Sequence, residues 1–126
     1  MKLRIKGPSL RLRLTQGEVR ALSDAGSVEE QVPFGGGVTL TYRLSRDAAA
    51  TRISASFSGG VLEIRVPEAQ VLAWCASDEV SLAASQEASP HTLAITVEKD
   101  FACLAPRTDE DESDNFPHPQ SGAKVC

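Results

Sequence analysis

The stretch that decides the fold is Leu10-Arg11-Leu12-Arg13-Leu14, which returns 52 residues later as Leu62-Glu63-Ile64-Arg65-Val66. In both stretches apolar residues alternate with charged ones, and this period of two is typical of a half-buried β-strand. An offset larger by one residue then places 40–44 on 93–97. The sequence therefore predicts that one structural unit occurs twice.

The first unit is predicted to contain a hairpin, a short helix and a second hairpin. Gly7-Pro8 supplies the first turn, and Gly35-Gly36-Gly37 supplies the second. Thr15 and Glu18 have the spacing of a capping box, in which each side chain accepts a hydrogen bond from the other residue's backbone N–H. Gly26 is placed to end the helix. The predicted strands are 2–6, 10–14, 28–34 and 38–44.

The second unit repeats this order. Ser58-Gly59-Gly60 is its first turn, and Pro67 opens its helix, where the missing N–H costs nothing. The helix is expected to end near Ser77, and a polar loop with Pro90 joins the last two strands. The predicted strands are 53–57, 61–66, 80–84 and 92–99.

These elements predict an α+β, mostly β domain over 1–104, with copies at 1–46 and 53–99 and an extended acidic tail at 105–126. One copy alone would leave a face of its strands exposed, whereas two copies related by a pseudo-twofold axis bury both, as in a symmetric dimer. We expect a barrel or a sandwich with one continuous core. Its expected members are Leu3, Ile5, Leu12, Leu14, Leu40, Tyr42, Leu62, Ile64, Val66, Leu93, Ile95 and Val97.

Composition favours a soluble protein without a membrane partner. The chain of 126 residues has a net charge of −4, divided into +4 for 1–46, −4 for 47–99 and −4 for 100–126. Nucleic-acid-binding domains are usually basic overall, so this chain would bind nucleic acid with its first half only. No apolar run could cross a bilayer, and the charged N-terminus lacks the apolar stretch of a secretion signal, which predicts a cytoplasmic location.

Five cations are the main candidate binding residues. By strand alternation Lys2, Arg4 and Lys6 project from one face of the first strand, and Arg11 and Arg13 project from its partner. Like charges on adjacent strands repel each other unless an anion lies nearby. The pattern therefore favours a surface for a phosphate backbone or for an acidic partner.

A purely structural role for these cations is the alternative. The strand face would then be solvated, with Glu29, Glu30 or the acidic tail as counter-ions. The tail residues 108–115 could also lie over the cations and compete with an external anion.

A metal site is a weaker hypothesis. The cysteines Cys75, Cys103 and Cys126 form an odd set without Cys-x-x-Cys spacing, so we expect three reduced thiols, with Cys75 as a small core residue. Mixed sets of Cys, His and carboxylate do bind zinc. The candidate ligands are Cys103, Asp109, Asp111 and His118.

A calcium loop is not predicted. Alternating oxygen donors begin at Asp109, but Asp114 stands where the turn glycine belongs and Gln120 stands where the bidentate Glu belongs. The chain also lacks a Ser-His-Asp order, and its triple glycine lacks the Lys-Ser/Thr of a phosphate-binding loop. We expect no cofactor, and a small metal-dependent enzyme is the third functional hypothesis.

The sequence resembles a family of small bacterial proteins of unknown function over almost its whole length. The resemblance is carried by Met1-Lys2-Leu3-Arg4-Ile5-Lys6-Gly7, by 9–15, and by Glu98-Lys99-Asp100-Phe101-Ala102-Cys103-Leu104 with the acidic run after it. It implies no activity.

The layout of each unit is similar to the AbrB/MraZ-type swapped-hairpin barrel, in which a strand ends in a Pro-led helix that a turn and two strands follow. Residues 61–71 and 78–82 fit this order, whereas the first unit has Thr15 in place of the proline. The resemblance implies DNA binding through basic residues near the first hairpin. In the second unit that hairpin has only Glu63 and Arg65, so a symmetric basic grip is not expected.

The sequence therefore predicts a non-enzymatic binding or adaptor protein whose basic strand face takes a protein partner or an anionic ligand. A nucleic-acid-binding regulator of swapped-hairpin type is the alternative. Because the two halves carry opposite charge, the chain is expected to be a monomer or a salt-sensitive homo-oligomer.

Overall fold

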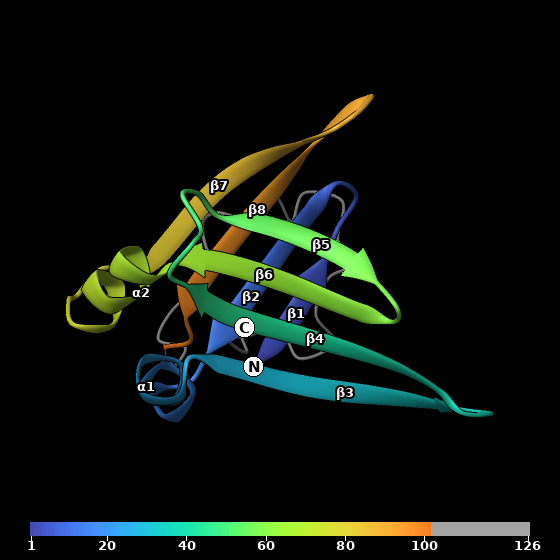
Figure 1. Ribbon diagram of the computed structural model, residues 1–126, viewed down its shortest axis with the longest axis horizontal. Coiled ribbons are helices and arrows are strands. Elements are labelled where there is room, and N and C mark those ends of the chain that lie inside the picture. Colours follow the sequence, from blue (N-terminus) through green and yellow to red (C-terminus); the bar gives the residue numbers. More distant parts are fainter. Residues whose placement is uncertain (102–126) are drawn as a thin grey trace, which may run out of the picture.

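The computed structural model describes residues 1–101, in which the order strand, strand, helix, strand, strand occurs twice (Figure 1). The first set is β1 (Lys2–Ile5), β2 (Ser9–Leu14), α1 (Gln16–Ala25), β3 (Ser27–Gly35) and β4 (Val38–Asp47). The second set is β5 (Ser54–Ser58), β6 (Val61–Pro67), α2 (Glu68–Cys75), β7 (Ser81–Ala88) and β8 (His91–Lys99). The predicted fold class, α+β and mostly β, is confirmed.

Each sheet combines one hairpin from each half of the chain. Sheet A has the strand order β1-β2-β8-β7, and sheet B has the order β3-β4-β6-β5. Hairpin partners are antiparallel, whereas β2 with β8 and β4 with β6 are parallel. The two hairpins of one half therefore do not pair with each other. Instead, the β1–β2 hairpin pairs with β7–β8, and the β3–β4 hairpin pairs with β5–β6.

The register of the two sheets agrees with a two-part repeat. Ser9 lies opposite Ala94 in sheet A. The offsets seen in the sequence convert this pair into Val61 opposite Thr41, which is the pair that sheet B contains. The parallel pairings thus begin at equivalent positions in both sheets.

The two sheets face each other with their strands crossing, and both helices lie at one end of the molecule (Figure 1). The barrel alternative is wrong, because both sheets are open, with β1 and β7 at the edges of sheet A and β3 and β5 at the edges of sheet B. Edges β5 and β7 are joined by the Gln86 amide group. It accepts from Ala55 N at 2.8 Å and donates to Ala55 O at 2.9 Å.

The helix ends follow local sequence signals. The capping box between Thr15 and Glu18 is present, and Gly26 ends α1 in the left-handed conformation at φ 94°, as predicted. Pro67 is the N-cap of α2 rather than its first residue. The helix α2 ends at Cys75, two residues before the predicted end, and Ser77 N then bonds to Trp74 O at 3.4 Å.

One continuous core joins both sheets and both helices, as expected. Ile5 is a wrong assignment, since it is 61% exposed, and Phe57, its equivalent in the repeat, is 66% exposed. Both residues lie near the turn end of an edge strand, where only one neighbouring strand covers them. Five further predicted members, Leu3, Leu40, Tyr42, Leu62 and Leu93, are only partly buried. The buried core is Leu10, Leu12, Leu14, Leu22, Leu44, Ile53, Ile64, Val66, Val71, Trp74, Leu82, Ile95 and Val97.

Candidate anion-binding face

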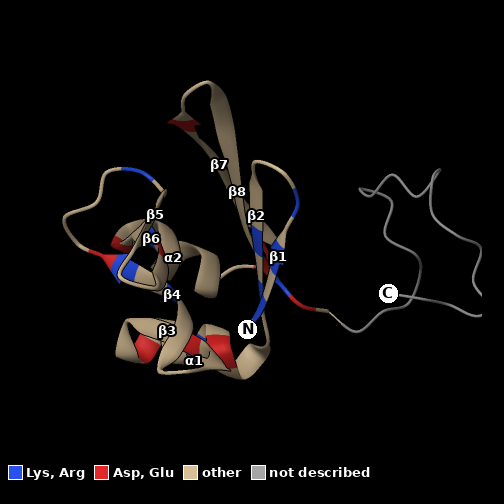
Figure 2. Cartoon of the chain, turned by 90° about the vertical axis from the view of Figure 1, so that its right-hand side faces the viewer, with Lys and Arg blue, Asp and Glu red and all other residues tan. Residues whose placement is uncertain are grey.

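The predicted cations lie along β1 and β2 (Figure 2), where they alternate with the residues that face the core. Because Leu12 and Leu14 are buried, the alternating Arg11 and Arg13 point away from the core. The antiparallel register sets Lys2 opposite Arg13 and Arg4 opposite Arg11. Lys6 is exposed and follows β1 directly. We call these five residues the basic face.

Glu98 on β8 is the main counter-ion of the basic face. It lies opposite Arg13 across the parallel pairing, and it is only 7% exposed. Arg13 Nε donates to Glu98 Oε1 at 2.5 Å, and Arg11 Nη1 donates to Glu98 Oε2 at 3.3 Å. A second carboxylate, Asp100, lies 3.3 Å from the Nζ atom of Lys2.

The counter-ions proposed from sequence, Glu29 and Glu30, serve other cations. Glu29 accepts a hydrogen bond from Arg43 at 3.0 Å, and Glu30 lies 2.7 Å from the terminal amino group of Met1. That assignment was wrong because both residues lie on β3, which belongs to sheet B. The basic face therefore has five cations, and the carboxylates Glu98 and Asp100 lie beside three of them, Arg11, Arg13 and Lys2.

The equivalent face of sheet B is not basic. Glu63 takes the place of Arg11 in the repeat, and it lies between Arg43 at 3.7 Å and Arg65 at 2.6 Å. Ser45 takes the place of Glu98 and donates to Glu63 at 2.9 Å. The cation cluster is thus confined to one sheet, as the sequence predicted.

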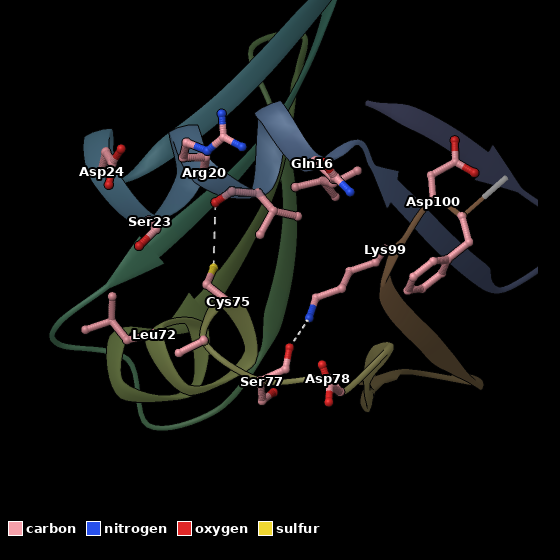
Figure 3. A pocket seen from close by; sticks show the side chains of 14 residues that line it. Gln16, Arg20, Ser23, Asp24, Leu72, Cys75, Ser77, Asp78, Lys99 and Asp100 are labelled. Carbon is pink, nitrogen blue, oxygen red and sulfur yellow. Dashed lines mark hydrogen bonds between the residues drawn. The ribbon is translucent and has the colours of Figure 1, made fainter.

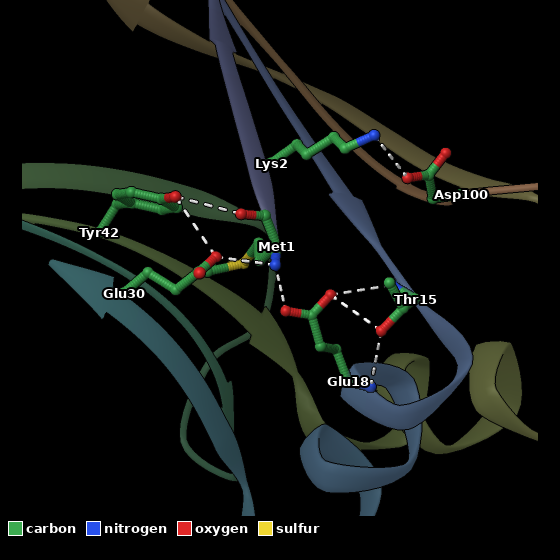
Figure 4. A network of polar contacts seen from close by, with 7 residues as sticks. All are labelled: Met1, Lys2, Thr15, Glu18, Glu30, Tyr42 and Asp100. Carbon is green, nitrogen blue, oxygen red and sulfur yellow. Dashed lines mark hydrogen bonds and ion pairs between the residues drawn. The ribbon is translucent and has the colours of Figure 1, made fainter. Parts of the chain in front are cut away.

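A network of polar groups at the chain start fixes β1 against α1 and sheet B (Figure 4). The amino group of Met1 is ion-paired with Glu18 and with Glu30. The hydroxyl of Tyr42 lies 3.1 Å from Met1 O, to which it donates, and 3.3 Å from Glu30 Oε2. Glu18 also belongs to the capping box with Thr15, so one carboxylate serves both the helix end and the strand.

This network shifts the ionisation of its members. Burial alone would lower the pKa of the Met1 amino group, but hydrogen bonds and charges from Glu18 and Glu30 outweigh it and raise that pKa. Burial would raise the pKa of Glu18, but hydrogen bonds from the amino group and from Thr15 lower it. Burial and the nearby charge of Glu30 raise the pKa of Tyr42. The sequence did not predict that Met1, Glu18, Glu30 and Tyr42 contact one another, because these contacts join β1, α1, β3 and β4.

A cleft of about 700 Å³ lies between the two helices and the end of β8 (Figure 3). Its walls include Arg20 and Asp24 from α1, Cys75 from α2, and Lys99 from β8. Cys75 is partly buried, packs against the core and donates weakly to Val19 O at 3.7 Å. Burial raises the pKa of this thiol, although the charge of Lys99 opposes the shift. The thiol is therefore protonated at neutral pH and is a poor nucleophile.

The repeat gives Lys99 in this cleft an equivalent residue in the first half of the chain. Lys99 is equivalent to Arg46, and each donates to the backbone carbonyls at the end of its own helix. Arg46 also pairs with Glu68, at the start of α2, at 3.2 Å. Gln16 takes the position of Glu68 on the cleft side, so Lys99 has no equivalent carboxylate there.

The candidate metal ligands Cys103, Asp109, Asp111 and His118 lie outside the described residues, as does the acidic tail. Within residues 1–101, no three His, Cys, Asp or Glu side chains come close enough together to hold a metal ion. The helices described, α1 and α2, are too short to span a membrane.

Comparison with known proteins gives one match. The chain matches a family of unknown function, DUF7009, over residues 1–120. Neither a curated protein nor a solved structure matches it.

Proposed function

This chain belongs to DUF7009, a family of unknown function, and we propose that it is a non-enzymatic binding protein whose basic face takes an acidic segment of a partner protein. The observation that carries the proposal is the cross-strand placement of like charges, Lys2 opposite Arg13 and Arg4 opposite Arg11. Such pairs destabilise a sheet when nothing anionic is near. Within residues 1–101, such like-charged cross-strand pairs lie only on the outer face of sheet A.

Internal counter-ions reduce this repulsion. Glu98 is shared by Arg11 and Arg13, and Asp100 lies beside Lys2, so two carboxylates serve these three cations. An incoming carboxylate therefore gains attraction and relieves repulsion, while its long-range attraction to the face speeds the encounter. The attraction should weaken as salt rises.

The position of β1 favours an extended partner. Within the described residues β1 pairs with β2 alone, so its other edge can accept a further strand. Alternate residues of an extended chain lie about 7 Å apart on one side, which is also the spacing of Lys2, Arg4 and Lys6 along β1. An acidic segment at this edge could therefore set successive carboxylates beside successive cations.

The test is the binding of a fluorescent peptide of about ten glutamates to the full-length protein, measured by anisotropy at two salt concentrations. Replacing Arg4 and Lys6 with glutamine should weaken binding about five- to tenfold at low salt. Arg20→Gln with Arg52→Gln is the matched control, because both side chains are exposed and lie off the basic face. Equal weakening by both double variants would contradict the proposal.

A nucleic-acid-binding role is the second candidate, which the exchange of hairpins between the halves favours, since the swapped-hairpin resemblance implies that arrangement. We rank it lower because the equivalent face of sheet B carries Glu63 and the chain is acidic overall. A DNA duplex of about 16 base pairs in place of the peptide tests it. Tight binding that falls steeply with salt and is lost in Arg4→Gln with Lys6→Gln would favour DNA.

The remaining expectations from sequence are proposals of the same kind. A cytoplasmic location, an origin by internal duplication, and a monomer that associates only at low salt all agree with the charge pattern and the repeated register. Light scattering at low and high salt tests the last of these. Metal analysis of the purified full-length chain tests the hypothesis of a metal-dependent enzyme.

A further inference from the structure

The described chain leaves sheet A beside the basic face. Asp100 follows β8 directly, and its N–H donates to Leu14 O at 2.8 Å, which continues the parallel pairing with β2 by one residue. The Asp100 carboxylate lies 3.3 Å from Lys2 Nζ, as Figure 4 shows. Asp100, the second-last residue that the structure describes, therefore lies next to the cations.

The sequence that follows is complementary in charge to the basic face. Residues 109–114 contain five carboxylates in six positions, Asp109, Glu110, Asp111, Glu112 and Asp114. No cation interrupts them, since the nearest are Arg107 and Lys124. Whichever side of an extended chain faces the cations, at least two carboxylates of this run point toward them.

The connection is long enough for this run to reach every cation. Nine residue steps separate Asp100 from Asp109 and span up to about 30 Å when extended. The four residues of β1 are about 14 Å long. A tether of this length also holds the run at an effective concentration in the millimolar range, so even weak attraction fills the face.

We propose that residues 108–115 bind in cis to the basic face and compete with the acidic segment of the partner. The inference rests on the proposed function and adds its regulation. When an internal segment occupies the face, the apparent affinity for the external ligand equals the intrinsic affinity multiplied by the fraction of molecules whose face is open. The salt dependence of partner binding is reduced as well, because the partner displaces carboxylates instead of small anions.

The test uses two full-length variants with the same change in net charge. In the tail variant Asp109, Glu110, Asp111 and Glu112 become Asn or Gln. In the control variant the same replacement is made at four other exposed carboxylates, namely Asp24, Asp78, Glu79 and Glu87. Binding of the glutamate peptide is measured for the parent and for both variants at about 50 and 200 mM salt.

We expect the tail variant to bind the peptide about three- to tenfold more tightly than the parent at low salt, with a steeper salt dependence. The control variant should change by less than twofold. A peptide of residues 108–115 added in trans should restore weak binding to the tail variant.

Two outcomes overturn the inference while leaving the proposed function intact, namely a tail variant that binds like the parent and a control variant that gains as much affinity as the tail variant. Failure of the parent and of both variants to bind the peptide at either salt concentration overturns the proposed function itself, and the inference with it.

Discussion

Glu98 is the residue on which the charge balance of sheet A depends most. It is nearly buried, and it holds two guanidinium groups from the neighbouring strand. The sequence places Arg11 and Arg13 correctly on one outer face, but Glu98 was not among the counter-ions it suggested, and two of those, Glu29 and Glu30, lie on the other sheet. The reason is physical, because the contact joins residues 85 and 87 positions apart and no local pattern encodes a parallel pairing over that distance.

Replacing Glu98 with Gln should destabilise the fold and strengthen anion binding. Two arginines would lose their shared counter-charge, which should lower the free energy of unfolding by about 2 kcal/mol. Peptide affinity should rise at the same time, because the face gains a positive charge. Urea unfolding and anisotropy measure the two effects. As a control, Glu87→Gln at an exposed position on β7 should change the unfolding free energy and the peptide affinity much less. If Glu98→Gln is as stable as the parent and binds the peptide equally well, Glu98 is not the main counter-ion of the basic face.

Gly60 illustrates a backbone requirement at the start of the parallel pairing. It has φ +76°, and an added Cβ would lie 2.9 Å from Thr39 O, while Gly60 O accepts from Thr41 N at 2.8 Å. The repeat has the same bond between Ala94 N and Pro8 O at 2.9 Å. The glycine turn itself was predicted from sequence, but the close approach to β4 was not.

Gly60→Ala should therefore cost more stability than Gly59→Ala. Both residues have positive φ, so both variants carry backbone strain of about 1 kcal/mol. Only Gly60→Ala adds a clash with a backbone carbonyl, which should bring its loss to about 2–3 kcal/mol. Thermal or urea unfolding of the two variants gives the comparison, and equal losses would exclude the clash as a cause.

At the scale of elements, the network at Met1 links β1, α1, β3 and β4: its amino group pairs with Glu18 and Glu30, and its carbonyl oxygen accepts a hydrogen bond from Tyr42. The capping box was visible in the sequence, since Thr15 and Glu18 are three residues apart. The ion pair between Glu18 and the Met1 amino group was not visible, because the spacing that predicts a helix cap does not show which other groups the same carboxylate contacts.

The stability contributed by this network should depend on pH in two directions. The pKa of the Met1 amino group is raised from an ordinary value of 8.0, so its contribution is complete below pH 8 and is lost as pH rises through the raised pKa. The pKa of Glu18 is lowered from 4.5, so its contribution is complete above pH 4.5 and is lost as pH falls through the lowered pKa. The network should stabilise most between these values.

Urea unfolding between pH 3 and pH 9.5 tests this for the parent and for Glu18→Gln. The variant should be less stable than the parent near pH 6–7, and the difference should shrink toward both ends of the range. Acetylation of the Met1 amino group should remove only the loss of stability at alkaline pH, because the acetylated group no longer titrates. A constant difference at all pH values would show that the ion pair contributes nothing that titrates.

At the scale of the whole molecule, the sequence predicted the order of elements but not all of their limits. The repeat of 10–14 at 62–66 was visible because both strands carry the same alternation. The helix and strand assignments follow from it, although β7 runs to Ala88, four residues further than the apolar pattern suggested. This extension is a hairpin arm with mostly exposed side chains, which periodicity cannot detect.

Because every sheet needs one hairpin from each half, neither half should fold as a monomer. Fragments 1–50 and 51–126 should each lack stable β-structure alone and should regain it when mixed in equal amounts. The cut falls in the exposed connection between β4 and β5, where few contacts are lost. Circular dichroism and sedimentation measure the result. A fragment that is folded and monomeric by itself would contradict the exchange of hairpins.

The parallel pairing of β2 with β8 also constrains how the protein can be made. On the ribosome, the hairpin of β1 and β2 emerges about 85 residues before its partner strand β8 has been synthesised. At cellular elongation rates this leaves its apolar face without a sheet partner for roughly 4–17 s. The nascent chain must therefore keep Leu10, Leu12 and Leu14 from associating with other chains until β8 becomes available.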